Sequence, residues 1–65
     1  MDVLEILKEV LEDEKAGAER YRKLAEEMTD AESRAIFEAL AREEDNHYRT
    51  VRERMTALKL RRQKG

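Results

Sequence analysis

Residues 44–47 read Glu44-Asp45-Asn46-His47 and lie inside the second of two long segments with helical periodicity. In an α-helix, residues three apart project from one face about one turn apart, so Glu44 and His47 are neighbours on the helix surface. The apolar residues of this segment follow the same face: Phe37, Leu40, Val51, Met55 and Leu58. Because Glu44 and His47 fall on this apolar stripe, we expect them to point toward a core rather than toward water.

The first segment carries a similar stripe at alternating spacings of three and four, formed by Leu4, Leu7, Leu11, Ala18, Tyr21, Ala25 and Met28. This pattern predicts a helix that packs at a shallow angle against other helices. Glu14 interrupts the stripe at a position where an apolar residue is expected. Gly17 follows about one turn later and weakens a helix, which indicates either a close approach of another backbone or room for something bulky.

The sequence Thr29-Asp30-Ala31-Glu32 lies between the two segments and has the form of a capping box. In that motif the Thr hydroxyl and the Glu carboxylate satisfy free backbone N–H groups at the start of a helix. We therefore predict one domain over residues 1–65, with a helix over about 2–28, a turn at about 29–30 and a second helix over about 31–62. No Gly or Pro breaks the chain here, so one continuous helix remains the alternative.

With a turn near Thr29, Glu14 lies about fifteen residues before the turn and Glu44 about fifteen residues after it. At a rise of about 1.5 Å per residue, both lie about 22 Å from the turn and therefore at one level of an antiparallel hairpin. A buried carboxylate without a partner is costly, so such groups are normally paired, neutralised or bound to metal. We therefore expect Glu14, Glu44 and His47 to bind metal together.

The composition is that of an all-α protein, since 46% of the 65 residues are charged, none is Pro and two are Gly. A chain this short rarely folds without a disulfide, a metal or a partner chain. Because Cys is absent, metal binding and oligomerisation remain. We predict an antiparallel two-helix hairpin that dimerises into a four-helix bundle. Its centre would hold a Glu from each of two helices and Glu-x-x-His from each of the other two, which is a di-metal donor set.

The net charge of -2 argues against a dedicated nucleic-acid surface. Cations near the C-terminus complement the negative end of the second helix, and no aromatic residues interleave with them: Lys59, Arg61, Arg62 and Lys64. No apolar run has the length of a membrane span, and the N-terminus lacks the basic start and apolar core of a signal peptide. We expect a soluble, cytoplasmic protein without nucleic-acid or membrane partners.

The residues around the predicted site resemble the ferritin-like superfamily, and within it the rubrerythrin-type di-iron domains and the short encapsulated ferritins. The resemblance rests on Glu14-Lys15-Ala16-Gly17-Ala18-Glu19-Arg20-Tyr21 and on Phe37-Glu38-Ala39-Leu40-Ala41-Arg42-Glu43-Glu44-Asp45-Asn46-His47. It implies that Glu14 is a terminal carboxylate ligand and that Glu44 bridges two metal ions. It also implies that His47 is a terminal imidazole ligand and that Tyr21 hydrogen-bonds a ligand carboxylate.

The resemblance implies a di-iron protein acting as a ferroxidase, an iron store or an oxidoreductase, with two iron ions per dimer and dioxygen or peroxide as oxidant. Carboxylates with imidazole also accept manganese, zinc or cobalt. Rubrerythrin-type domains carry two such helix pairs in one chain and this chain carries one, which makes a homodimer, or a higher multiple of dimers, a requirement. The alternative is a non-catalytic hairpin dimer that serves as a structural or interaction module.

Overall fold

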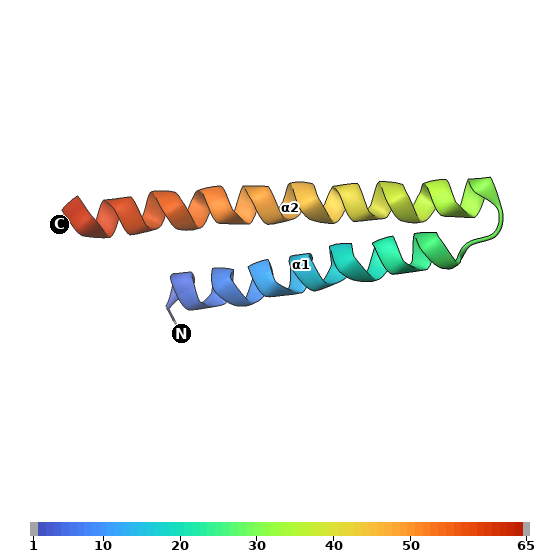
Figure 1. Ribbon diagram of the computed structural model, residues 1–65. Helices are drawn as coiled ribbons and strands as arrows, with labels where there is room; N and C mark the ends of the chain where they lie inside the picture. Colours follow the sequence, from blue (N-terminus) through green and yellow to red (C-terminus); the bar gives the residue numbers. More distant parts are fainter. Residues whose placement is uncertain (1, 65) are drawn as a thin grey trace.

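The computed structural model describes residues 2–64 and consists of two antiparallel α-helices. Helix α1 spans Val3–Glu27 and helix α2 spans Ala31–Lys64. The two helices lie side by side and are joined by one short connection (Figure 1). The all-α hairpin predicted from the sequence is confirmed. Met1 and Gly65, which the prediction of one domain over the whole chain includes, lie outside the described residues.

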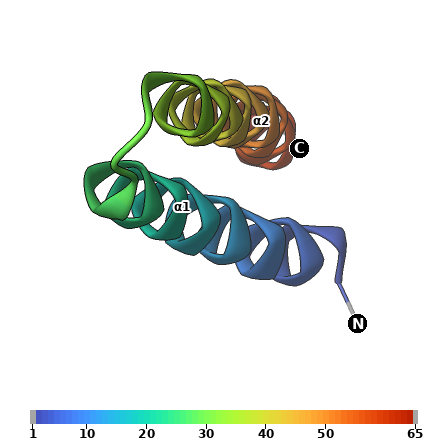
Figure 2. The same cartoon turned by 90° about the vertical axis from the view of Figure 1, so that its right-hand side faces the viewer.

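The two helices differ in length, with 25 residues in α1 and 34 in α2. At about 1.5 Å per residue, α2 is about 51 Å long, which accounts for the 54 Å length of the molecule. The C-terminal end of α2 therefore extends past the start of α1 (Figure 1). Viewed nearly along its long axis (Figure 2), the hairpin is one helix packed on one other. Within residues 2–64, neither helix combines the length and the apolar character needed to cross a bilayer.

Asp30 immediately precedes α2 and caps its first turn. Its Oδ2 atom accepts a hydrogen bond of 2.8 Å from the Ser33 N–H group, and its carbonyl accepts one of 3.1 Å from Arg34 N–H. The Ser33 backbone N–H, followed by its hydroxyl, stabilises the Asp30 carboxylate and lowers the pKa of that group. The capping prediction for Thr29 is therefore wrong by one residue. Thr and Asp are both good capping residues, and Asp30 is the one whose carboxylate reaches the third residue of the helix.

The connection between the helices needs no glycine. Met28 directly follows α1 and has an extended conformation, and its N–H donates to the Ala25 carbonyl at 3.2 Å. Arg34 then reaches back from α2, where its Nη2 atom donates to the Met28 carbonyl at 3.0 Å. Positive φ angles are absent from the part of the chain that the structure describes, so ordinary L-residues can make this turn.

The open end of the hairpin is held by a two-point ion pair. Asp2 precedes α1, and its carboxylate does not cap the helix. Instead, Arg62 donates from Nη1 to Oδ2 at 3.0 Å and from Nη2 to Oδ1 at 2.5 Å. These hydrogen bonds lower the pKa of Asp2 and raise that of Arg62. One cation of the predicted tail, Arg62, therefore has a definite partner just before α1. The side chain of Lys64 lies outside the described residues.

Small side chains line the contact between the helices. The buried apolar residues are Ala18, Ala25, Ala41 and Met55. The larger apolar and aromatic residues on both stripes are only half-buried: Leu4, Leu7, Leu11, Tyr21, Met28, Phe37, Leu40, Val51 and Leu58. Val10 and Leu24, which the stripe of the first segment left out, are half-buried as well. The alanines let the helices approach closely. The larger apolar side chains lie beside this contact and remain partly exposed to solvent.

Candidate metal centre

Three potential ligands meet in the middle of the hairpin. Glu14 comes from α1, Glu44 and His47 come from α2, and each offers one donor atom, all within 4.8 Å of one another. The Nδ1 atom of His47 lies 3.3 Å from Glu14 Oε2 and 3.8 Å from Glu44 Oε1. When Nδ1 carries its proton, it donates a hydrogen bond to Glu14. The structure thus brings together all three residues that the sequence predicted as metal ligands.

Helical geometry explains why these side chains meet. Glu44 and His47 are three residues apart on α2 and project from one face. Antiparallel pairing through a connection at residues 28–30 then brings Glu14 of α1 to the same level. The helices are close at this height because Ala18 and Ala41 are buried between them, so side chains as short as Glu can reach across the interface.

The cluster is open on one side. The side chains of Glu14 and Glu44 retain 21% and 23% of their exposure, whereas His47 retains 59%. The carboxylates are therefore largely covered, and the imidazole is the exposed member of the cluster. A metal ion held by these three groups alone would keep open coordination positions facing away from the hairpin.

Electrostatics at the cluster favour a positive counter-charge. The pKa of Glu44 is raised, first because its carboxyl group shares a hydrogen bond with Glu14, and then because of partial burial and repulsion by the Glu14 carboxylate. The nearby His47 opposes this shift. Two carboxylates that compete for one proton also form a natural site for a divalent cation, which neutralises both. The donor set therefore fits a metal ion chemically.

A scan against protein-family models matched this chain to the model described as Rubrerythrin over residues 5–64. The chain belongs to the rubrerythrin family. The match confirms the resemblance drawn from the Glu14 and Glu44 to His47 motifs, and it covers nearly all of both helices. Comparisons with curated proteins and with solved structures found no match.

Tyr21 of this rubrerythrin domain lies two turns after Glu14 on α1 and is half-buried. Its ring stacks on Phe37 of α2, with ring centroids 6.3 Å apart and planes at 27°. Among the described residues, the hydrogen bonds include none between the Tyr21 hydroxyl and Glu14 or Glu44. Within one hairpin, Tyr21 therefore packs against α2, and its expected contact with a ligand carboxylate remains a prediction.

Sequence reasoning missed one interaction beside the centre. Arg22 of α1 donates a hydrogen bond to Asp45 of α2, and the two side chains form an ion pair. Asp45 directly follows the candidate ligand Glu44, so this ion pair joins the two helices next to the cluster. Residues 23 positions apart leave no periodic signal in a sequence, so only the fold reveals this contact.

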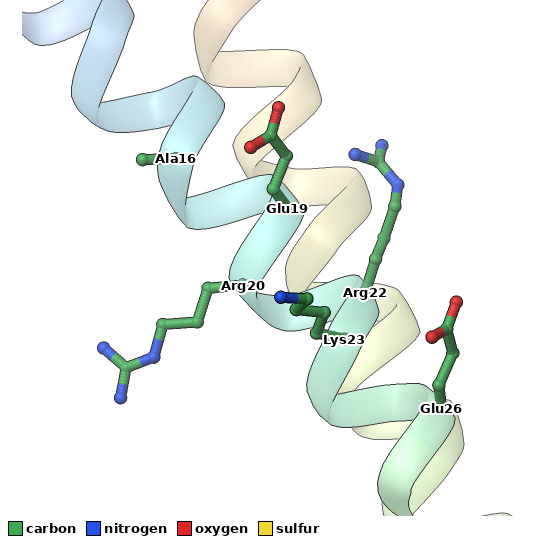
Figure 3. Close-up of a pocket in the computed structure, with 6 residues that line it drawn as sticks. All are labelled: Ala16, Glu19, Arg20, Arg22, Lys23 and Glu26. Atoms are coloured by element: carbon green, nitrogen blue, oxygen red, sulfur yellow. The ribbon is translucent and has the colours of Figure 1, made fainter.

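A hollow along α1 takes no part in the centre. It is lined by Ala16, Glu19, Arg20, Arg22, Lys23 and Glu26, all from one helix (Figure 3). The long side chains spread apart along the helix, and Arg20 and Arg22 point in different directions (Figure 3). Glu14, Glu44 and His47 are not among its lining residues. This hollow is a solvated surface of α1.

Proposed function

We propose that two copies of this rubrerythrin-family hairpin form a four-helix bundle whose centre binds two iron ions and oxidises ferrous iron. The observation that carries this proposal is the convergence of Glu14, Glu44 and His47 within 4.8 Å. The family match supports a carboxylate-rich metal protein of this type.

The need for a second copy follows from the number of ligands. One hairpin supplies three donor residues, and two copies supply six, namely four carboxylates and two imidazoles. That set corresponds to the di-metal pattern of one Glu from each of two helices and Glu-x-x-His from each of the other two. The open side of the cluster and the half-buried apolar residues around it favour the same arrangement, because a second hairpin would cover both.

Each residue has a proposed role. Glu14, Glu44 and His47 would hold the metal ions. By the family resemblance, Glu44 would be the ligand that both ions share, and Glu14 would bind one ion as a terminal ligand. His47 supplies Nδ1, since this is the ring nitrogen that faces both carboxylates. Tyr21 is proposed to donate a hydrogen bond to a ligand carboxylate in the assembled dimer and so to fix its orientation.

Iron in such a centre supplies the electrons for the reaction. Two ferrous ions would each give up one electron, and these two electrons together with two protons would reduce dioxygen to hydrogen peroxide, or hydrogen peroxide to two molecules of water. Hard carboxylate oxygens stabilise the ferric product, and imidazole suits iron as well. The same donors also accept manganese, zinc or cobalt. Assays with redox-inert ions therefore test metal binding alone, whereas assays with ferrous iron also test its oxidation.

The proposal is tested by adding ferrous iron without oxygen, then admitting air and recording near-ultraviolet absorbance and dioxygen consumption. The wild type is expected to take up about one iron per chain and to develop ferric absorbance. Glu44→Gln should lose both responses. Glu43→Gln is the matched control, because Glu43 is an exposed carboxylate on the preceding residue and lies outside the cluster. Wild type that takes up no iron would leave the structural hairpin dimer as the better description.

A further inference from the structure

Gly17 occupies the middle of α1, where glycine is a poor choice for helix stability. Its backbone φ is not positive, so alanine would adopt the same conformation without strain. Glycine in a helix interior is destabilising relative to alanine because the unfolded chain has more freedom to lose. The atoms that pack against Gly17 should therefore explain why this residue has no side chain.

The carboxyl end of Glu44 lies against Gly17. A Cβ atom built on Gly17 would lie 2.6 Å from Glu44 Oε2, 3.2 Å from Cδ and 3.5 Å from Cγ. The first distance is shorter than any stable contact between carbon and oxygen, and the second is tight. The Glu44 side chain thus crosses the surface of α1 in the space that a methyl group would fill. Gly17 is also three residues after Glu14, so it lies on the same face as the other carboxylate.

We propose that Gly17 is a positioning residue for the metal centre, because its missing side chain lets the Glu44 carboxylate lie against α1 beside Glu14. This inference rests on the proposed metal-binding function. A methyl group at residue 17 pushes the Glu44 carboxylate away from the backbone of α1. The carboxylate then leaves the position from which it approaches both Glu14 and His47.

The fold itself should tolerate that change. The atoms that would clash belong to the far end of a flexible side chain and not to backbone. The metal-free protein therefore has little packing to lose and gains helix propensity. Stability and metal affinity are expected to move in opposite directions, whereas a purely structural role for Gly17 would move both in the same direction.

The experiment measures cobalt(II) affinity by calorimetric titration, and the melting temperature of the metal-free protein, for wild type, Gly17→Ala and Ala16→Gly. Gly17→Ala should bind cobalt(II) about 10- to 100-fold more weakly, which is the usual loss when a residue that orients a ligand is changed. Its metal-free melting temperature should rise by about 4–8 °C. Ala16 is exposed on the outer side of α1, so Ala16→Gly should lower the melting temperature and leave cobalt(II) affinity unchanged.

A second variant pair tests whether the effect acts through Glu44. Glu44→Asp shortens the side chain by one carbon, so its carboxylate oxygens reach only as far as Glu44 Cδ, 3.2 Å from the added methyl group instead of the 2.6 Å of Glu44 Oε2. A small shift of the side chain relieves this contact. In that background, Gly17→Ala should cause little further loss of cobalt(II) affinity. An equal loss in both backgrounds, or unchanged affinity of Gly17→Ala in the wild-type background, would overturn the inference while leaving the proposed function intact. Wild type that binds no cobalt(II) and no iron would overturn both.

Discussion

The uncovered surface of the hairpin leads to a quantitative prediction about its assembly. The chain exposes 5263 Å², whereas a compact monomer of 7.7 kDa exposes about 4,300 Å² by the usual scaling with mass. The excess of about 950 Å² is close to the roughly 800 Å² that each partner contributes to a standard protein interface. We therefore expect a dimer in which this extra surface is covered.

A charge at Leu40 should weaken that dimer. Leu40 is half-buried and lies one turn before Glu44 on α2, so it belongs to the face that carries the candidate ligands. Fully covering an exposed Leu side chain contributes about 1.5–3 kcal/mol. Because Leu40 is already half-buried in the hairpin, the dimer can gain only about half of this from each of its two copies. Leu40→Glu should therefore weaken the dimer by about 1.5–3 kcal/mol, or about 10- to 10²-fold in Kd.

The assay is sedimentation velocity together with the concentration dependence of the melting temperature. Wild type should sediment as a dimer or a multiple of it, and its melting temperature should rise with protein concentration. Leu40→Glu should shift toward monomer, whereas Ala35→Glu, which adds the same charge at an exposed position of α2, should not. A stable wild-type monomer whose melting temperature is independent of concentration would refute the reasoning.

Three further predictions concern charged groups. The pKa of Glu44 is raised in the folded protein, so between about pH 4.3 and that raised value the folded metal-free protein binds more protons than the unfolded chain. The free energy of unfolding should therefore fall as pH rises through this window. Urea unfolding of Glu44→Gln should not show this decrease. Glu14→Ala should raise the melting temperature of the metal-free protein at neutral pH and weaken metal binding, and unchanged metal affinity would remove Glu14 from the ligand set. The pKa of Asp30 is lowered in the folded protein, so the stability that its carboxylate contributes as a helix cap should be present above about pH 3.9 and be lost as pH falls through the lowered pKa. Asp30→Ala should therefore melt at a lower temperature than wild type at neutral pH, and this difference should shrink in acid.

The sequence was sufficient to predict the cluster because helical rise and periodicity are fixed. Glu14 and Glu44 lie equally far from the connection, so counting residues brought them to one level before any side-chain position was known. The spacing of Glu44 and His47 then fixed the face that they share. These features depend on backbone geometry alone, which is why they could be read from spacing.

Features that depend on side-chain direction could not be predicted. Thr29 and Asp30 are adjacent residues of similar capping strength, so only the hydrogen bond from Ser33 identifies Asp30 as the cap. Gly17 indicated that something approaches α1, but the approaching group, Glu44, is set by its rotamer. The pairing of Arg62 with Asp2 joins residues sixty positions apart, and spacing gives no hint of it.

The central claim is that Glu14, Glu44 and His47 from two chains together build a site for two metal ions. Native mass spectrometry of the protein with ferrous iron added in the absence of oxygen tests it most directly, because it reports chain number and metal number in the same particle. We predict a dimer, or a multiple of it, that carries two iron ions per two chains, with no iron on monomers. Iron bound to single hairpins, or dimers that remain free of metal while iron is in excess, would contradict the claim.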